Sequence, residues 1–481
     1  MRTSKIAIAL FCACTMLGAS AQPQNPFANA QWPAPAGYPG TTFSLSHDYP
    51  ASAPVPAMPW RVAINNQPIS TANASAYAEA LKAAVGDDMR VLLQDYKNWD
   101  APKRGWYNEP WLGATMREPI HGMYVGSSPL SNTLFSGSGL TKPISTYVLT
   151  YYDKTAAVTL NKVWGSTAMT PSVTAQNTQF AEGSIIIKAA FITAGPTVWP
   201  VMKGALSWPL YIEVNATKQA APSKTPIMTP TYLMQFDIIV KDSVSAPKTG
   251  WVFTTLVYDA SVAPTDPDIW NRMVVLGAQW GNDPQANDPS VPNPVLLENW
   301  NNPKAPTYGG ETFGWGQRLS GPNDGAMNDI AYAAGTTPTP QKYVKNGKDS
   351  SCMSCHSSAQ WNLQNQKLGM DSFLLPLTTA RPSPPPGCKV TKKDPNPACS
   401  NFLNSPQPGS VEWMKWFQNR QGNVPMDAGS IAGDFDMVLT FKSLPAWFSA
   451  TQGAGEHSLH KFDLRGKRTL PTPATSSKPV H

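Results

Sequence analysis

The stretch Cys352-Met353-Ser354-Cys355-His356 combines residue types and a spacing with a clear chemical meaning. Two thiols three positions apart can form thioethers with the two vinyl groups of one porphyrin, and the histidine that follows can ligate its iron. On one helical turn both sulfurs and the imidazole reach the same ring. The sequence therefore predicts one covalently bound haem c, attached through Cys352 and Cys355, with His356 as the proximal iron ligand.

Two other uses of a CxxC pair fit the surrounding sequence less well. A thioredoxin-like redox motif lies in a βαβ setting, and no such pattern surrounds this one. A zinc site needs a second close pair of ligands, whereas Cys388 and Cys399 are eleven positions apart. Haem attachment is the interpretation that the spacing favours.

The second axial ligand of the iron decides the chemistry, because Met or His makes an electron carrier and an open position permits ligand binding. Met426 lies in the loop Gly422–Gly429, stiffened by Pro425, and such a segment can approach iron from the far face. We predict Met426 as the distal ligand. The alternatives are methionines expected in a core or too close to the motif, and histidines outside it: Met414, Met437, Met370, His457, His460, His47 and His121.

Residues 1–21 have the pattern of a secretory signal peptide. Arg2 and Lys5 precede an apolar run, and Ala19-Ser20-Ala21 offers a small-x-small cleavage site. The run is too short to span a bilayer, and no later segment reaches ~18 apolar residues, so no transmembrane segment is expected after cleavage. Export together with a haem-attachment motif predicts a bacterial periplasmic protein. In that oxidising compartment Cys388 and Cys399 are expected to form a structural disulfide.

Composition and length limit the remaining possibilities. The chain has 481 residues, of which 14% are charged, with 48 Pro, 34 Gly and 17 Trp, which is typical of a folded, loop-rich and β-rich protein. The formal charge is +6, and no basic run suggests a nucleic-acid partner. A chain this long is expected to contain at least two domains. The oligomeric state is left open.

Residues 22–335 are predicted to form an antiparallel, β-rich domain, sandwich- or barrel-like. A helix is expected over residues 72–96, and 259–335 is expected to be a long, aromatic-rich and mostly irregular connection. The strand signals are short β-branched or aromatic runs bounded by Pro, Gly and Asp, at 147–152, 184–189, 210–214, 233–240 and 251–258.

Residues 336–465 are predicted to form a small α-helical haem domain, followed by a disordered tail over 466–481. Helices are expected over Cys352–Gln366 and over Ser410–Arg420, where Ser410 is the N-cap. A third helix is expected after Asp434 and should end at Pro445. The overall prediction is an α+β protein of two domains.

No catalytic set of residues accompanies the haem motif. Paired carboxylates and the GxSxG, HExxH and phosphate-loop motifs are missing from the sequence. Aspartates of the β-rich region are assigned to strand ends or turns, where Asp is common for conformational reasons: Asp153, Asp237, Asp242, Asp259 and Asp283.

With this motif in view, residues 340–460 resemble c-type cytochromes, and Cys352, Cys355 and His356 match their attachment and proximal positions. A longer region also resembles a family of large proteobacterial periplasmic monohaem cytochrome c proteins. That resemblance rests on the order of Gly250–Thr255, Gln279–Asp283, Glu298–Trp300, Gly314–Leu319 and Ser351–His356.

The resemblance implies a periplasmic cytochrome that passes electrons to or from a partner redox protein. An electron carrier is favoured over a substrate-converting enzyme, because a candidate Met ligand exists and a catalytic set does not. Two alternatives stay open. One is a haem-containing oxidoreductase, with a substrate site in the N-terminal domain or a peroxidatic haem. The other is a five-coordinate haem sensor of a small ligand.

Overall fold

The computed structural model describes nine ranges of the chain: 25–30, 33–115, 117–213, 226–286, 294–323, 330–334, 342–346, 350–362 and 411–451. The predicted signal peptide (1–21), the tail (466–481) and the Cys388–Cys399 pair lie outside them, as do Met370, His457 and His460. Within the described residues no helix is long and apolar enough to cross a membrane.

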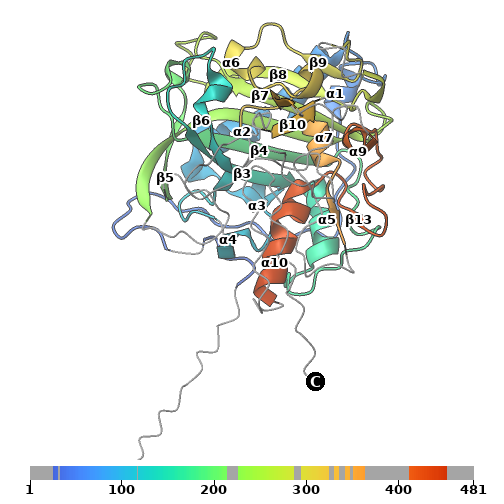
Figure 1. The fold of residues 1–481 in the computed structure, drawn as a ribbon. Coiled ribbons are helices and arrows are strands. Elements are labelled where there is room, and N and C mark those ends of the chain that lie inside the picture. Colours follow the sequence, from blue (N-terminus) through green and yellow to red (C-terminus); the bar gives the residue numbers. More distant parts are fainter. Residues whose placement is uncertain are drawn as a thin grey trace, which may run out of the picture.

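A nine-stranded antiparallel sheet dominates the molecule (Figure 1). Its order is β1-β3-β4-β6-β7-β8-β9, with β2 paired to β3 and β5 to β6, so these nine strands form one continuous sheet. The strands are Trp106–Tyr107 (β1), Tyr124–Leu130 (β2), Ile144–Asp153 (β3), Ile185–Ile192 (β4), Ser207–Ile212 (β5), Ile227–Lys241 (β6), Trp251–Tyr258 (β7), Met273–Gln279 (β8) and Asn299–Asn301 (β9). All five predicted strands are confirmed, and with them the α+β class in its coarse form.

The two faces of the sheet are both covered, which explains why its central strands are apolar almost throughout. Successive side chains of β3 alternate between faces. Tyr147, Leu149 and Tyr151 belong to the core beneath helix α2 (Ala74–Gln94). This helix confirms the prediction for 72–96. Gly86 is buried in this helix, where a Cβ would meet Arg90 and Trp270.

The opposite face carries a second core, shared by segments far apart in the sequence. Helix α5 (Lys154–Trp164) and α7 (Cys352–His356) lie on it with α10 (Leu444–Thr451), and Figure 1 shows the three together in front of β3 and β4. Met353 and Phe435 are buried in this core beside Trp251 and Tyr152 of the sheet. Residues 350–362 and 411–451 therefore pack directly on the sheet. The predicted boundary between residues 335 and 336 stays a prediction.

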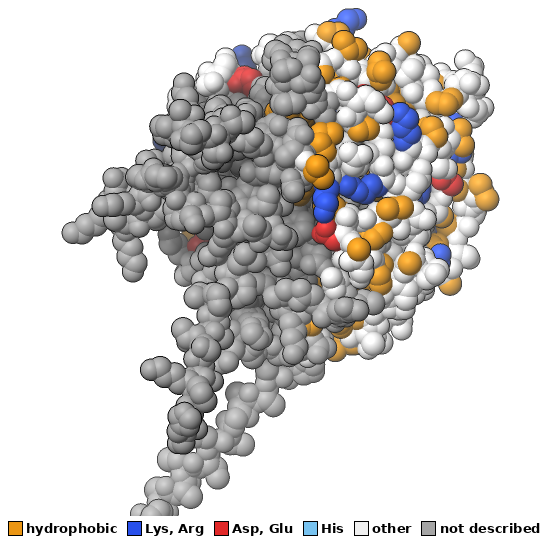
Figure 2. Space-filling model, turned by 45° about the vertical axis from the view of Figure 1, so that its right-hand side comes forward, with side chains coloured by type: hydrophobic (Ala, Val, Ile, Leu, Met, Phe, Trp, Pro, Cys, Tyr) orange, Lys and Arg blue, Asp and Glu red, His pale blue; other side chains and the backbone are white. Residues whose placement is uncertain are grey.

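The remaining elements are short. Two small antiparallel ladders join β10 (Ile330–Ala334) to β11 (Lys342–Asn346) and β12 (Gln360–Trp361) to β13 (Ile431–Ala432). The other α-helices are Pro59–Val62 (α1), Ala101–Arg104 (α3), Leu112–Thr115 (α4), Thr307–Gly310 (α6) and Val411–Met414 (α9). On the face shown in Figure 2, hydrophobic side chains are scattered among polar ones over the described part.

The helices predicted around the haem motif are wrong in length. The helix predicted over Cys352–Gln366 stops at His356, because Ser357 and Ser358 donate side-chain hydrogen bonds back to the carbonyls of Ser354 and Cys355. The helix predicted over Ser410–Arg420 is reduced to α9, where Val411 is 77% exposed. Phe417, within the range of the same predicted helix, is instead buried in a turn.

Pro445 does not end the third predicted helix. The chain runs from Met437 through a wide π-helical turn (Leu439–Ser443) directly into α10. The wider turn shifts the hydrogen-bond ladder just before the proline, which has no N–H to contribute. The region 259–335, expected to be mostly irregular, contains two strands of the main sheet, β8 and β9.

Candidate functional site: a cavity between the CMSCH helix and the sheet

Helix α7 is too short to be stable alone, and its surroundings hold it. Ser351 caps it: its Oγ accepts from the N–H of Ser354 at 3.1 Å, and the Ser354 Oγ accepts from the N–H of Ser351 at 2.7 Å. Gln279, at the end of β8, accepts from the Met353 N–H at 2.9 Å and donates to the Ser351 Oγ at 3.2 Å. The helix start is thereby fixed to the sheet.

The chain before α7 passes against another backbone segment at Gly314. The N–H of Trp315 donates to the carbonyl of Ser350 at 3.0 Å, and the N–H of Cys352 donates to the carbonyl of Leu319 at 2.9 Å. A Cβ at Gly314 would overlap the Ser350 carbonyl oxygen. Glycine is therefore required at this position for the two segments to meet.

A hydrogen bond to one ring nitrogen orients His356. Its Nδ1 lies 2.7 Å from the backbone carbonyl oxygen of Phe435. A carbonyl oxygen only accepts, so Nδ1 must carry the proton, and Nε2 of the neutral ring is left as the basic nitrogen. The ring packs against Phe253, with centroids 4.6 Å apart. This is the arrangement in which metal-ligating histidines are commonly oriented.

The carbonyl that holds His356 belongs to a strained turn. Asp434 and Phe435 have φ values of 47° and 68°, a conformation that costs free energy in residues other than glycine. The buried Asp434 carboxylate accepts from Trp251 Nε1 and Lys241 Nζ, both at 2.7 Å, and from the Phe180 N–H at 2.8 Å. These hydrogen bonds fix the turn and aim the Phe435 carbonyl.

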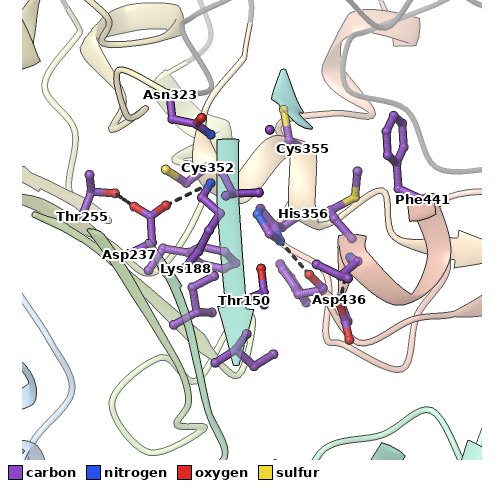
Figure 3. A pocket seen from close by; sticks show the side chains of 18 of the residues that line it. Thr150, Lys188, Asp237, Thr255, Asn323, Cys352, Cys355, His356, Asp436 and Phe441 are labelled. Carbon is purple, nitrogen blue, oxygen red and sulfur yellow. Dashed lines mark hydrogen bonds and ion pairs between the residues drawn. The ribbon is translucent and has the colours of Figure 1, made fainter. Parts of the chain in front are cut away.

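Cys352, Cys355 and His356 line one cavity beside the contact between α7 and the sheet (Figure 3). Its volume is about 1280 Å³ with its open mouth included, and its walls are mainly apolar. The other walls come from β2, β3, β4, β6 and β7, and from the segment between Phe435 and Lys442. The three motif residues thus face one cavity.

The sheet presents two rows of side chains to this cavity, each crossing the strands in direct register. One row is apolar and comprises Ile186, Ile239 and Phe253, the last of which touches His356. The next row, about 7 Å further along the strands, is polar. It runs from β3 to β7 through Thr150, Lys188, Asp237 and Thr255, and Figure 3 shows its members with the two cysteines and His356.

Asp237 anchors the polar row. It pairs with Lys188 Nζ at 3.0 Å and accepts from Thr255 Oγ1 at 2.8 Å and from Gln235 Nε2 at 2.9 Å. The assignment of Asp237 to a strand end or turn is wrong, because it lies inside β6. A buried ion pair adds little net stability, since desolvation offsets the attraction, so its presence in a cavity wall suggests a functional role.

Two interacting acids are buried nearby, and one of them, Asp436, lines the cavity. Asp436 lines the cavity and accepts from the Tyr152 hydroxyl at 2.9 Å, and burial raises the pKa of its carboxyl to about 6. Glu109 accepts from Trp164 Nε1 at 2.7 Å. Burial, and then the charge of Asp436, raise the pKa of Glu109 well above its usual value.

The candidate distal ligands have different locations. Met426 packs among Trp416, Phe417 and Cys355 and is not among the residues that line the cavity. Met437, expected in the core, lines the cavity and contacts Phe441. Two other candidates lie elsewhere: His47 stacks on Phe27, and His121 stacks on Trp208, where burial lowers its pKa to about 3.

Sequence reasoning missed three parts of the site: Gln279, the Asp434–Phe435 turn and the polar row. Lys188 had a usable signal, because it is the single charge in the apolar run from Ile185 to Phe191. The sequence carries no such signal for Phe435, because this residue acts through its backbone carbonyl.

Among the described residues, no group of three or more His, Cys, Asp or Glu side chains could hold a metal ion. No protein-family model, curated protein or solved structure matches this chain.

Proposed function

We propose that this protein is a periplasmic monohaem c-type cytochrome that transfers electrons to or from a partner redox protein. The observation that carries the proposal is the hydrogen bond from His356 Nδ1 to the Phe435 carbonyl, in a cavity that both cysteines line. It leaves Nε2 as the basic nitrogen in the neighbourhood of two thiols. A haem fits this combination better than a redox dithiol, which needs no oriented imidazole beside it.

The cavity offers residues for haem attachment, for iron ligation and for apolar contact. Cys352 and Cys355 would form the thioethers, His356 would ligate the iron, and Ile186, Ile239 and Phe253 would offer apolar contact. The haem supplies reversible one-electron chemistry, and burial and ligation set its potential. Export by residues 1–21, a haem domain over 336–465 and a Cys388–Cys399 disulfide belong to the same proposal. So does a methionine as distal ligand, for which the two candidates are Met426, from the sequence, and Met437, which lines the cavity.

The test is to express the chain in the periplasm of a host that attaches haem c, and to measure the mass and absorption spectrum of the product. We expect one covalently bound haem in the unmodified protein and none in Cys352→Ala/Cys355→Ala. Met353→Leu is the matched control, because it changes the buried residue between the two cysteines and should keep the haem. A folded protein without covalent haem would refute the proposal.

The polar row supports a second candidate, a haem-containing oxidoreductase. Lys188 and Asp237 lie in the wall of the same cavity and could orient a small molecule beside the iron. A five-coordinate sensor would need the same access. Carbon monoxide and peroxide separate these functions from a carrier, because rapid binding of either to the holoprotein requires an open iron position.

A further inference from the structure

A second, more open groove lies on the α2 side of the sheet. One wall is the segment 41–45, and the other is the segment 96–104, which includes α3. The volume of the groove is about 1360 Å³ with its open mouth included. Phe43 and Leu45 are buried in the same core as α2, and the groove shares none of its described lining residues with the cavity beside α7. The groove is therefore separate from the proposed haem site.

One edge of the segment 41–45 is bonded as a strand would be. The N–H of Phe43 donates to the carbonyl of Ile120. The side-chain amide of Asn29 then bonds twice to this edge. Its Nδ2 donates to the Phe43 carbonyl at 3.0 Å, and its Oδ1 accepts from the Leu45 N–H at 2.6 Å. A residue of a neighbouring strand makes the same pair of contacts, so this part of the chain has the geometry of a strand edge.

The other edge of the same segment is open. In an extended chain the peptide groups of successive residues point to opposite edges, so those of Thr42 and Ser44 point away from Asn29. Both residues are exposed and line the groove, and neither forms a hydrogen bond within the described part of the chain. Their side chains are small and uncharged, unlike the charged or proline residues that usually protect such edges. The Thr42 carbonyl and the Ser44 N–H thus form an acceptor and a donor at the spacing that an added strand uses.

The opposite wall of the groove is rich in basic side chains. It presents Lys97, Lys103 and Arg104, against the single lining acid Asp100. Lys103 pairs with Asp100 at 2.6 Å, and Arg104 pairs at 2.8 Å with Asp88, which lies outside the lining. Lys97 is exposed and forms no ion pair with the residues that the structure describes. A chain that enters the groove therefore meets an unmatched positive charge, which favours an acidic occupant.

We propose that this groove binds an extended, acidic peptide of a partner protein, which adds as a strand to the open edge of residues 41–45. The Thr42 carbonyl accepts a hydrogen bond from the peptide backbone, the Ser44 N–H donates one to it, and Lys97 pairs with an Asp or Glu side chain of the peptide. In this mode of recognition backbone hydrogen bonds supply affinity and side chains supply specificity. Because the groove lies apart from the cavity beside α7, the proposal stands or falls independently of the proposed function.

The probe is a fluorescein-labelled short peptide of alternating Val and Glu, which presents one type of side chain to each face of an added strand. Fluorescence anisotropy with the full-length protein should show saturable binding. A peptide of alternating Val and Lys should bind about fivefold more weakly, since surface charge pairs contribute little free energy each. Hydrogen exchange followed by mass spectrometry should show slower exchange over residues 41–45 when the acidic peptide is bound. Absence of saturable binding at millimolar peptide would overturn the proposal.

Two variants at one position test the backbone contact. Ser44→Pro removes the N–H that an added strand needs, whereas Ser44→Ala removes only an exposed hydroxyl. We expect Ser44→Pro to lose binding and Ser44→Ala to keep it. Since proline also restricts the segment itself, two acidic peptides that are N-methylated at one or the other set of alternate residues repeat the test on the unmodified protein. Only one of the two should bind, and equal binding of both would contradict strand addition.

Lys97→Glu tests the preference for an acidic peptide, with Lys304→Glu as the control. Lys304 is exposed and does not line the groove, so the control makes the same change of charge elsewhere. Lys97→Glu should reverse the preference between the Glu and Lys peptides, and Lys304→Glu should leave it unchanged. Equal effects of the two variants would contradict the role of Lys97.

A second copy of this chain is the competing occupant of the open edge. Analytical ultracentrifugation of the unmodified protein, of Ser44→Ala and of Ser44→Pro distinguishes it from a partner peptide. We expect the same oligomeric state in all three. A dimer that only Ser44→Pro converts to a monomer would assign the edge to self-association and overturn the proposal.

Discussion

Gln279 connects the main sheet to the start of α7 through its buried side-chain amide. Its oxygen accepts from the Met353 N–H and its nitrogen donates to Ser351. Gln279→Met keeps the length of the side chain but leaves the Met353 N–H unsatisfied, so we expect a loss of about 1–3 kcal/mol in the free energy of unfolding. The measurement is urea unfolding, with the exposed Gln67→Met as control. Equal stability of the two variants would mean that water replaces the amide.

Under the proposed function, single residues also decide which methionine is the distal iron ligand. Met437 lines the cavity and Met426 does not, so a methionine that ligates iron should be Met437. We expect Met437→Leu to remove the far-red Met-to-iron band of the oxidised spectrum and Met426→Leu to keep it. The reverse result would support the sequence-based assignment of Met426. Absence of the band from the unmodified protein would mean that neither residue is a ligand.

At the scale of elements, the contact between Gly314 and Ser350 sets where α7 begins. A Cβ at position 314 would overlap a backbone oxygen, which cannot move without carrying the helix start with it. Gly314→Ala should cost about 1–3 kcal/mol and reduce the fraction of chains with covalent haem. Gly310→Ala is the control, because its Cβ would make only ordinary contact with Phe313. Thermal unfolding and haem content report the two effects separately.

The central strands could be predicted from local sequence, whereas the lengths of the helices around Cys352–His356 depend on long-range contacts. β4 and β7 are runs of β-branched and aromatic residues whose apolar character is decided locally. The length of α7 depends on Ser357 and Ser358 and on pairing with a strand distant in the sequence. Asp237 was assigned to a strand end or turn because aspartate is common in turns. Its place inside β6 depends on Lys188 and Thr255 of the neighbouring strands, which the local sequence does not show.

For the whole molecule, buried acids should make stability fall as the solution becomes less acidic. Burial raises the pKa values of Asp153 and Asp436 to about 6 and of Glu118 to about 7. The unfolded chain loses these protons near pH 4, so the folded state binds more protons between about pH 4 and 7. The free energy of unfolding must therefore fall across that window.

His121 opposes this trend, because burial lowers its pKa to about 3 and the folded state there binds fewer protons than the unfolded chain. Because three acids bind extra protons in the folded state and one histidine binds fewer, we still expect the free energy of unfolding to fall as the pH rises. Urea unfolding at intervals from pH 4 to pH 8 gives the slope, and Asp436→Asn should make it shallower. A free energy of unfolding that rises throughout this range would contradict the assignment.

The ladder between β12 and β13 joins two segments that are far apart in the sequence. Gln360 pairs with Ala432 and Trp361 with Ile431, and the Gly433 N–H donates to the carbonyl of Ala359 at 2.8 Å. His356 and the Phe435 carbonyl thus meet whatever the length of sequence between the two strands. Doubling a closed loop adds only about 0.6 kcal/mol of chain entropy. Insertions between residues 362 and 411, which leave the buried Trp416 and Phe417 in place, are therefore the changes in length that evolution could make most cheaply near this site.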